Sequence, residues 1–455
     1  MKKKENIVVL HRSEENPILQ PNPGHPWESK AVFNPGVCQI GGDAHLFYRA
    51  MSDDDTSVIG YALTRDGVHI HDRLPDPVYV PREAFEKKLK SGTGSGCEDP
   101  RLTRIGDTMY MCYTAYDGVH PPRIALTSIL IDDMLAKRWN WSKPRLISPP
   151  GVDDKDAAIF PEKINGKYAV LHRIGISIWI DFVDDLTFKP KQLLGGRILM
   201  NPRTGSSHSQ KIGICGPPMK TADGWLLLYH GISRRKDRHY DVRAALLDLN
   251  DPTRVLARTS YPIFEPETPY ERNGLVANVV FPCGSAVING TLYVYYGGAD
   301  KVVGVACVEL EQLSELLRSE SIRQPYIDIP KQKSRRETKQ PNHEVRPWGE
   351  YTVLDRGDGF QVKRITIHPG QEISYQFHHH RSEHWTIVSG KARIDINDHL
   401  EEKKSEDMIS IPSGVKHRIK NIGDADLIFI EVQNGTNIDE GDVERLSDDY
   451  GRIGH

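Results

Sequence analysis

The sequence predicts an all-β chain made of a five-bladed β-propeller followed by a small jelly-roll domain. The first reason is a unit that recurs five times: a proline near the start of a short strand, a glycine-containing turn, and alternating apolar residues that end in Tyr, His or Arg. The turn glycines are 64, 60, 58 and 66 residues apart, at Gly42, Gly106, Gly166, Gly224 and Gly290. Because one such unit is a sheet that cannot bury both faces alone, the repeat predicts five blades around an axis.

The second reason is a change of pattern after residue 330. The run KQKSRRETKQPNHE, which begins at Lys331, is polar throughout apart from Pro341, as is typical of a solvated linker. Beyond it, short strand patterns separated by Gly, Pro and Asp turns fill about 110 residues, as in a small jelly roll. We therefore predict a propeller domain over residues 1–330, a linker over 331–345 and a jelly-roll domain over 346–455. A surface loop inside one domain is the alternative, and the complete change of pattern counts against it.

The elements of the first domain follow from local patterns. Residues up to about 30 are polar and proline-rich and are expected to form an arm across the first blade. Alternating runs such as HLFYRA, TMYMCYTAY, YAVLHR, WLLLYHG and LYVYYGG predict the strands between residues 31 and 310. Helical spacing is confined to a short turn at 83–90 and to residues 311–322, where three leucines would lie on one face.

Composition argues against several classes of function. With 38% hydrophobic and 27% charged residues, the chain has the make-up of a globular protein, and its formal net charge of −3 argues against a general nucleic-acid or membrane surface. No run approaches the ~20 apolar residues of a membrane-spanning helix, and the basic start is followed by too short an apolar run for a signal peptide. The six cysteines lack a CxxC pair, as expected of free thiols. We expect a cytoplasmic homo-oligomer without nucleic-acid or membrane partners.

The inner strands of the predicted blades indicate where a site would lie. The first strand of each blade lines the axis, so the residues before the repeat prolines should converge on one funnel: Asn34, Asp99, Phe160, Pro217 and Phe281. Asp99 is the single acid among these five. Basic residues fall at or near strand ends on the same predicted face, namely Arg49, Arg123, Arg173, Lys211 and His230. One carboxylate among several cations predicts a site for a small dianion such as phosphate.

This combination suggests cleavage of a sugar by phosphate. A glycosidase normally needs two carboxylates, whereas a phosphate nucleophile is already anionic and needs a basic cradle instead of the second one. Aromatic residues of the repeats, Tyr113 among them, would supply the flat walls that sugar rings favour. An Asp has an ordinary pKa near ~3.9, so Asp99 would need a raised pKa to act as an acid at neutral pH, while nearby cations would lower it. An Asp before a proline can also simply cap a turn, and the joint placement of these residues is what favours a site.

The segments GCEDPRLTRIGDTMYMCYTAY, FPEKINGKYAVLHR, KIGICGPPMKTADGWLLLYHG and ERNGLVANVVFPCGSAVINGTLYVYYGGAD resemble glycoside hydrolase family 130, the β-mannoside phosphorylases. The likeness covers roughly residues 33–308. It implies a five-bladed propeller and an inverting phosphorolysis of a β-mannoside to α-mannose 1-phosphate, with inorganic phosphate as co-substrate. It also implies that Asp99 is the general acid and relays its proton through a mannose hydroxyl group.

The same resemblance implies further site residues. Phosphate contacts carry over to Arg123, Arg173, Lys211 and His230, and contacts to sugar or phosphate to Arg49, Arg65, Tyr113 and Asp300. Substrates would be a β-mannoside oligosaccharide or mannosyl-N-acetylglucosamine. A β-mannosidase, which would release free mannose, and a non-enzymatic sugar-binding propeller stay open as alternatives. The linkage, β-1,4 or β-1,2, stays open as well.

The last domain carries a histidine pattern typical of a metal site. Alternation on the strand QFHHHRSEHW puts His378 and His380 on one face, and PSGVKH, followed by Asn421, ends in His417. The H-x-H pair followed by P-x-G-x-x-H-x-x-x-N closely matches the cupin pattern. The best-aligned ligands are His378, His380, His384 and His417; Glu383 competes with His384 for the third place, and Gln376 can also ligate.

The wider segment, VKRITIHPGQEISYQFHHHRSEHWTIVSGKARI, resembles the cupin domain of type II mannose-6-phosphate isomerase. The likeness implies a divalent metal, zinc or a similar ion, and a phosphosugar bound by Lys363, Arg381 and Arg452. Isomerisation would pass through a metal-polarised enediol. A non-catalytic sugar-binding or dimerising cupin is the alternative, because a metal site alone does not define a reaction.

Overall fold

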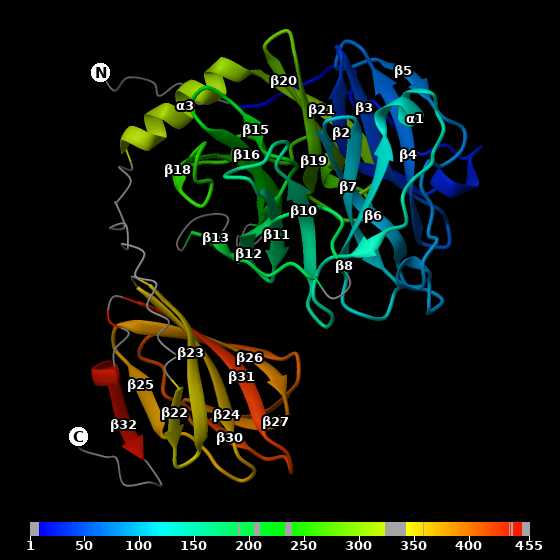
Figure 1. Cartoon of the computed structure of the whole chain (residues 1–455). Coiled ribbons are helices and arrows are strands. Elements are labelled where there is room, and N and C mark those ends of the chain that lie inside the picture. The colour runs from blue at the N-terminus through cyan, green and yellow to red at the C-terminus, as the bar shows by residue number, and fades with distance from the viewer. Residues whose placement is uncertain are drawn as a thin grey trace. The chain divides into compact units, whose positions relative to one another are not determined.

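The structure is a computed structural model that describes residues 9–189, 192–203, 210–232, 239–323, 343–357, 359–435, 437 and 440–447. The chain divides into two compact units, Met1–Tyr326 and Ile327–His455. Each unit is built almost entirely of antiparallel strands (Figure 1). The prediction of an all-β chain is confirmed. The predicted linker lies outside the described residues except for its last three.

The first unit begins with two groups of strands. They are β2 (Ala31–Ile40), β3 (Asp43–Met51), β4 (Thr56–Thr64) and β5 (Ile70–Arg73), and then β6 (Ser95–Ile105), β7 (Thr108–Tyr116), β8 (Arg123–Leu130) and β9 (Arg145–Leu146). A short parallel pairing joins the start of β4 to the start of β6, so the two groups form one sheet. Both groups are antiparallel within themselves.

Three further antiparallel groups follow along the chain. The third holds β10 (Asp154–Ile159), β11 (Tyr168–Ile174), β12 (Ser177–Val183) and β13 (Arg197–Met200). The fourth holds β14 (Lys211–Ile214), β15 (Met219–Lys220), β16 (Trp225–Ile232), β17 (Tyr240–Leu247) and β18 (Val255–Arg258). The fifth holds β19 (Val280–Ile288), β20 (Thr291–Gly298), β21 (Val302–Glu309) and, from the N-terminal arm, β1 (His11–Arg12). The arm was predicted to lie across the first group. Glu28 of the arm does accept a hydrogen bond from Tyr48 of that group, and β1 also pairs with β21 of the fifth group.

Hydrophobic clusters fill the space between successive groups. Adjacent residues of a strand point to opposite faces, so each group contributes to two clusters. The clusters join Phe47 to Met111, Ile124 to Val170, Leu171 to Leu227, Leu228 to Val294, and Leu46 of the first group to Val305 of the fifth. Burial of each such side chain contributes about 1.5–3 kcal/mol before entropy is considered.

Short helices connect and cover these groups. They are η1 (Pro26–Glu28), η2 (Ala84–Glu86), α1 (Ile131–Leu135), α2 (Pro269–Arg272) and α3 (Leu310–Arg323). The helix predicted at 311–322 is confirmed by α3, whose leucines pack into the cluster between the fourth and fifth groups. No helix in the described part of the chain is long and apolar enough to cross a membrane.

Buried glutamates brace three of the groups in the same way. Glu28, Glu86 and Glu271 are fully buried in η1, η2 and α2, and each accepts a hydrogen bond from a tyrosine hydroxyl of a second strand: Tyr48, Tyr113 and Tyr296, respectively. Backbone amides of the helix start also donate to Glu86 and Glu271. A buried carboxylate is stabilised by such charge-assisted hydrogen bonds, so these tyrosines hold short helices against their sheets.

The second unit consists of two sheets. One contains β22 (His343–Arg346), β23 (Gly349–Gly357), β24 (Phe360–Ile367), β31 (Leu427–Gly435), β26 (Arg381–Ser389) and β29 (Met408–Ile411). The other contains β28 (His399–Lys404), β27 (Lys391–Ile396), β30 (His417–Asn421), β25 (Tyr375–His378) and β32 (Val443–Ser447), which follows η3 (Glu440–Asp442). Alternating apolar residues, such as Ile365, Trp385 and Ile394, form one core.

Candidate active site and metal centre

Asp99 lies at a bulge in β6. Glu98 pairs with Thr114 and Arg101 with Cys112, so Asp99 and Pro100 together oppose a single residue of β7. Asp99 has a φ of 52°, in the left-handed region that Asp adopts more readily than most residues. Bulges of this kind re-aim side chains, and they are common next to active sites.

The same bulge recurs in the first strands of two other groups. Asn34 in β2 has a φ of 47° and Asp156 in β10 a φ of 56°, each at an interruption of the pairing with the next strand. Phe160 was predicted at the position that Asp156 occupies, but its side chain is fully buried and packs on Trp225 with ring centroids 5.1 Å apart. Asp99 is therefore not the single acid at these bulges in the first strands.

Asp99 is held as a hydrogen-bond acceptor by two neighbours. Asn34 Nδ2 donates to Asp99 Oδ1 at 2.9 Å, and Arg49 Nη1 donates to the same oxygen at 3.3 Å. Arg49 Nη2 donates to Glu98 Oε1 at 2.8 Å. Burial raises the pKa of Asp300 to about 7; Arg49 lowers it, and Asp99 and Glu98 raise it further. Glu98 and Asp99 thus bind the guanidinium group of Arg49, and Asp300 lies near enough to raise the pKa of Arg49.

Arg101 connects Asp99 to the second inner carboxylate. Its Nη1 donates to the backbone oxygen of Asp99 at 3.0 Å, and its Nη2 donates to Asp156 Oδ1 at 3.1 Å. Arg173 Nε donates to Asp156 Oδ2 at 2.6 Å. Burial alone would raise the pKa of Asp156, but Arg173 and Arg101 outweigh it and hold this pKa far below its usual range. Asp156 is therefore an ionised carboxylate that orients two arginines.

Two further basic side chains gather at Asp156. His230 Nε2 lies 3.7 Å from Asp156 Oδ2, and burial lowers the pKa of His230 to about 3, so the imidazole is neutral at neutral pH. Burial, with Arg173 close by, lowers the pKa of Lys211 to about 8, and Asp156 partly offsets this shift. Lys211 remains mostly a cation at neutral pH. The sequence-predicted residues Arg173, Lys211 and His230 are thus brought together.

Arg123 begins β8 and contacts the segment that leads from β9 to the third group. Its guanidinium donates to the backbone oxygen of Ser148, and burial lowers its pKa, partly offset by Asp154. His172 Nδ1 lies 2.9 Å from Asp154 Oδ2, two residues before Asp156. Arg123 is therefore beside the segment that carries Asp156.

Strand alternation explains which residues reach the site. Arg49, Arg173 and His230 each follow a core-facing residue on the second strand of a group: Tyr48, His172 and Tyr229, respectively. On β7 the corresponding core-facing residue is Tyr113, and its hydroxyl contacts Glu86 and lies 2.9 Å from the Tyr79 hydroxyl. The structure does not bring Tyr113 to Asp99, because the alternation turns it into the core.

Arg65 is also not brought to Asp99. It follows the last residue of β4, where Thr64 pairs with Ala44, whereas Arg49 pairs with Ile59 nearer the other end of β4. Its side chain is 64% exposed, and its Nε lies 3.9 Å from Asp43 Oδ2. Arg65 and Arg49 therefore lie towards opposite ends of the same strand pair.

Sequence reasoning missed Asp156 and Glu98 as members of this cluster. The repeats are aligned on their prolines, and β10 has Ala157 where β2 and β6 have a proline after the bulge residue. In the structure Lys155 pairs with Arg173, and Asp156 follows at the bulge. An alignment of the repeats on His172-Arg173, instead of on the prolines, would therefore have marked Asp156.

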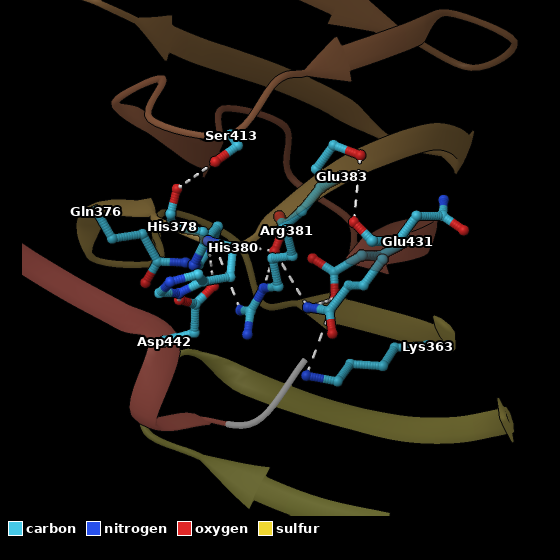
Figure 2. Close-up of polar contacts among 12 residues, drawn as sticks. Lys363, Gln376, His378, His380, Arg381, Glu383, Ser413, Glu431 and Asp442 are labelled. Carbon is cyan, nitrogen blue, oxygen red and sulfur yellow. Dashed lines mark hydrogen bonds and ion pairs between the residues drawn. The ribbon is translucent and has the colours of Figure 1, made fainter. Parts of the chain in front are cut away.

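In the second unit, three residues form a compact donor group: His378, Glu383 and His417, all buried, with one ligand atom of each within 4.8 Å of the others. His378 Nε2 lies 2.9 Å from Glu383 Oε1, and His417 Nε2 lies 3.6 Å from Glu383 Oε2. Figure 2 shows His378 and Gln376 on one side of Arg381, with Glu431 and Lys363 on the other. The backbone of Gln376 pairs with that of His417, so Gln376 is close to this group.

His380 and His384 were predicted as ligands, and the structure does not bring them to this donor group. His380 Nδ1 lies 2.7 Å from Asp442 Oδ1, and its side chain is 59% exposed. His384 is exposed on β26, where residues alternate between faces, so it points away from the face that carries Glu383. Glu383, the alternative to His384 in the sequence pattern, lies on the buried face of the same strand, beside His378 and His417.

The donor group fits a divalent cation. His417 Nδ1 interacts with the backbone oxygen of Val415 at 2.9 Å, which leaves Nε2 as the unprotonated nitrogen facing Glu383. Neither His378 Nδ1 nor His417 Nε2 has a hydrogen-bond partner in the described part of the chain. Two imidazoles and a carboxylate are ligands that zinc and similar ions accept. Arg381 Nε also donates to Glu383 Oε1, at 3.2 Å.

A cavity of about 70 Å³ adjoins Glu383. Basic side chains line much of it: Arg346, Lys363, Arg381 and Arg445. Lys363 Nζ lies 4.0 Å from Glu431 Oε2, and Gln433 Nε2 donates to both Glu383 and Glu431. Of the residues expected to bind a phosphosugar, Lys363 and Arg381 line the cavity and Arg452 lies outside the described residues.

Comparison with known proteins gives relatives for the second unit. Residues 333–448 match the family model described as mannose-6-phosphate isomerase C-terminal. Mannose-1-phosphate guanylyltransferase ManC of Salmonella typhimurium is 46% identical over 108 residues, which cover 24% of this chain and 22% of that protein. The similarity is thus to one part of a longer protein.

The first unit has relatives along its whole length. Residues 1–319 match the glycoside hydrolase family 130 model, described as beta-1,4-mannooligosaccharide phosphorylase. A beta-1,2-mannobiose phosphorylase of Thermoanaerobacter sp. (strain X514) is 41% identical over 320 residues, which cover 67% of this chain and 98% of the relative. The solved beta-1,2-mannobiose phosphorylase of Listeria innocua, in complex with beta-1,2-mannobiose, is 30% identical with a TM-score of 0.57, covering 68% of this chain and 99% of that one. The chain therefore belongs to glycoside hydrolase family 130, the family of mannoside phosphorylases, and carries a C-terminal domain related to mannose-6-phosphate isomerase.

Proposed function

We propose that the first unit is an inverting phosphorylase that cleaves a β-1,2-mannoside with inorganic phosphate and releases α-mannose 1-phosphate. The observation that carries this proposal is the cluster around Asp156. Arg101, Arg173 and Lys211 are cations, Asp156 is an anion and His230 is neutral, so the cluster has a surplus of two positive charges. That surplus matches a phosphate dianion, and Arg101 bridges the cluster to the backbone of Asp99.

We further infer that the first unit is a closed five-bladed β-propeller over residues 1–330, joined through the 331–345 linker to the domain over 346–455. Support comes from the five antiparallel groups, and from the hydrophobic cluster that the first group shares with the fifth. Inner strands β2, β6 and β10 would then carry Asn34, Asp99 and Asp156 around the axis.

In the proposed reaction the anomeric carbon is attacked by a phosphate oxygen on the face opposite the leaving group. The bond from this carbon to the glycosidic oxygen breaks as the bond to phosphate forms. The glycosidic oxygen takes a proton that originates from Asp99, and the phosphate later returns one proton to the enzyme. Arg173 and Lys211 hold the phosphate, with Arg123 and His230 at its periphery, and positioning plus charge neutralisation supply the catalysis.

Asp99 and Arg49 would act on the mannosyl unit. Asp99 accepts two hydrogen bonds in the free protein, from Asn34 and Arg49. A sugar hydroxyl that enters this cluster can take over one of these bonds and carry the proton towards the leaving oxygen. Asp300, which faces Arg49, is the further sugar-contacting group that this geometry supports.

The linkage is tested by product analysis. The relatives of the first unit favour a β-1,2-linked substrate, although the matching family model is described by β-1,4-linked oligosaccharides. Incubation of β-1,2- and β-1,4-mannobiose, each with and without phosphate, should give mannose 1-phosphate from the β-1,2 isomer only when phosphate is present. Faster reaction of the β-1,4 isomer would overturn the linkage assignment, and equal release of free mannose without phosphate would indicate a β-mannosidase.

A second candidate function, carried by the second unit, is sugar-phosphate isomerisation. The match to mannose-6-phosphate isomerase and the basic cavity beside Glu383 favour it. His378, Glu383 and His417 would hold a divalent cation, which when bound would polarise the carbonyl group of an open-chain sugar. Lys363 and Arg381 would bind the phosphate group. Conversion of mannose 6-phosphate to fructose 6-phosphate tests this function, and its absence in metal-loaded protein would leave a binding domain.

A further inference from the structure

A second group of potential metal ligands lies in the first unit, at the start of β17. It contains His239, Asp241 and Glu265, and one ligand atom of each lies within 4.8 Å of the others. His239 Nε2 lies 3.2 Å from Glu265 Oε1. Donors that share one cation at about 2.0–2.2 Å lie roughly 3.3–3.6 Å apart in a tetrahedral site. The distance between His239 and Glu265 is close to this spacing.

Backbone pairing explains why these three residues meet. His239 directly precedes β17 and Asp241 is its second residue, so strand alternation turns both side chains to the same face. Val242 forms an antiparallel bridge with Phe264, and the Val242 amide donates to the Phe264 oxygen at 2.8 Å. Glu265, the residue after Phe264, therefore comes opposite Asp241.

Asp241 is fully buried and held in a fixed orientation. Arg243 Nε donates to Asp241 Oδ1 at 3.0 Å, and Arg243 Nη2 donates to Asp241 Oδ2 at 3.1 Å. A carboxylate has about four lone-pair sites, so each of its oxygens can accept a further partner. Carboxylates that bind metals are themselves usually hydrogen-bonded by such neighbours. Arg243 therefore orients Asp241 as a ligand and leaves it able to bind a cation.

The donor set favours one class of cation. One imidazole with two carboxylates suits zinc and similar transition-metal ions, whereas Ca²⁺ and Mg²⁺ prefer sites made of oxygen alone. Three protein ligands leave room for a water molecule on the same ion. The side chain of Glu265 is 49% exposed and that of His239 is 13% exposed, so an ion can enter from the solvent.

We propose that His239, Asp241 and Glu265 bind one zinc ion or a similar divalent cation, which ties the start of β17 to the segment between β18 and α2. The site is separate from the donor group of the second unit and does not depend on the reaction proposed above. Its consequence is positional, because Tyr240 lies between two of the ligands and its ring centroid is 5.8 Å from that of His230. The ion thus steadies one wall of the proposed phosphate site.

The test is a metal titration of the full chain after treatment with a chelator, because an ion at a half-exposed site exchanges with the solvent. The His378→Ala/His417→Ala background removes the donor group of the second unit. In this background, equilibrium dialysis should show one Zn²⁺ per chain and Ca²⁺ binding that is at least ~10-fold weaker. His239→Ala should weaken Zn²⁺ binding at least ~100-fold and Glu265→Gln at least ~10-fold, since even the loss of an outer partner of a ligand costs about 10–100-fold.

The matched control is Glu267→Gln, at a carboxylate two residues after Glu265. The side chain of Glu267 is 75% exposed and accepts a hydrogen bond from Arg12 Nη1 at 3.0 Å. Glu267→Gln should bind Zn²⁺ as tightly as its parent. Equal weakening by Glu267→Gln and Glu265→Gln would show diffuse attraction to acidic side chains and overturn the proposal.

A folded background variant that binds no Zn²⁺ would also overturn the proposal. So would unchanged Zn²⁺ affinity in both His239→Ala and Glu265→Gln, because His239 and Glu265 would then form an ordinary hydrogen bond. The same comparison without the background substitutions covers the case in which that variant does not fold. There His239→Ala should bind one Zn²⁺ fewer than the wild type, and equal numbers would contradict the site.

Discussion

Lys211 links the charge of the proposed phosphate site to pH. Burial, with Arg173 nearby, lowers its pKa to about 8, so its positive charge is present below pH 8 and is lost as pH rises above it. At a constant concentration of phosphate dianion, we expect the KM for phosphate to rise about tenfold between pH 7 and pH 9, because one cation is lost. Initial rates of mannose 1-phosphate formation measure this.

The matched variant for this prediction is Lys211→Arg. An arginine stays charged throughout this range, so the variant should show a KM for phosphate that no longer depends on pH above 8. If Lys211→Ala kept the pH dependence of the wild type, Lys211 would not be a phosphate contact.

At the residue scale, the sequence predicted the members of the site that a local pattern marks. The EDPR turn marked Asp99, and the repeat alignment, which puts Arg173 and His230 near strand ends on one face, marked those two. Asp156 escaped because its bulge lacks the proline on which the repeats were aligned. Tyr113 and Arg65 were expected at the site, and the structure places neither of them there. Which residue of a strand faces the site depends on the register of the strand, and the register is fixed by pairing with a neighbouring strand.

At the scale of secondary-structure elements, Tyr113 helps to hold the helix η2 against its sheet. Its hydroxyl donates to the fully buried Glu86 of η2. Tyr113→Phe removes a hydrogen bond to a charged group and should lower the free energy of unfolding by about 2 kcal/mol, measured by urea denaturation. KM and kcat should change less than about twofold. Tyr110→Phe, on the opposite face of the same strand, is the control, and a raised KM for mannoside in Tyr113→Phe would return this residue to the site.

Gly213 in β14 tests how closely the elements pack around Asp156. A Cβ atom at this position would lie 2.4 Å from Asp156 Oδ2 and 2.5 Å from His230 Cε1. Since both neighbours are buried, Gly213→Ala should displace the carboxylate that orients Arg101 and Arg173. We expect the KM for phosphate to rise at least about tenfold, a loss of about 1.4 kcal/mol in binding.

Gly175→Ala supplies the control for this variant. A Cβ atom there meets no heavy atom within 4 Å, although its φ of 60° makes the change mildly unfavourable for folding. An unchanged KM for phosphate in Gly213→Ala would show that the cluster around Asp156 does not bind the anion.

Strands and helices could be predicted where apolar residues recur with a constant spacing along the sequence. The strands and α3 follow from alternation and helical spacing, because burial of one face imposes those periods. The position of β1 could not be predicted, since its pairing with β21 joins residues nearly 300 apart in the sequence. In the candidate donor group, His378 and His417 follow from the motif. The motif left Glu383 and His384 as alternatives, and only the structure separates them, because residues of β26 alternate between a buried and an exposed face.

At the scale of the whole molecule, each unit has a core of its own. The first unit has its clusters between strand groups and the second has the cluster around Trp385. The beta-1,2-mannobiose phosphorylase of Thermoanaerobacter matches the first unit over 98% of its own length. We therefore expect the double variant His378→Ala/His417→Ala to lose the bound divalent ion, measured by elemental analysis of the purified protein, without a change in phosphorolysis.

The control for this prediction is His343→Ala/His399→Ala, which changes two exposed histidines of the same unit. It should keep the metal. Loss of phosphorolysis in the His378→Ala/His417→Ala variant with its melting temperature unchanged would show that the two units are functionally coupled.

The central claim is that inorganic phosphate, held by cations around Asp156, attacks the mannosyl carbon. The most direct measurement is the reaction of β-1,2-mannobiose with phosphate in ¹⁸O-labelled water, followed by ³¹P NMR and mass spectrometry. The account predicts α-mannose 1-phosphate without ¹⁸O at the anomeric oxygen, and no reaction when phosphate is left out. Free mannose that carries ¹⁸O, formed at the same rate without phosphate, would contradict it.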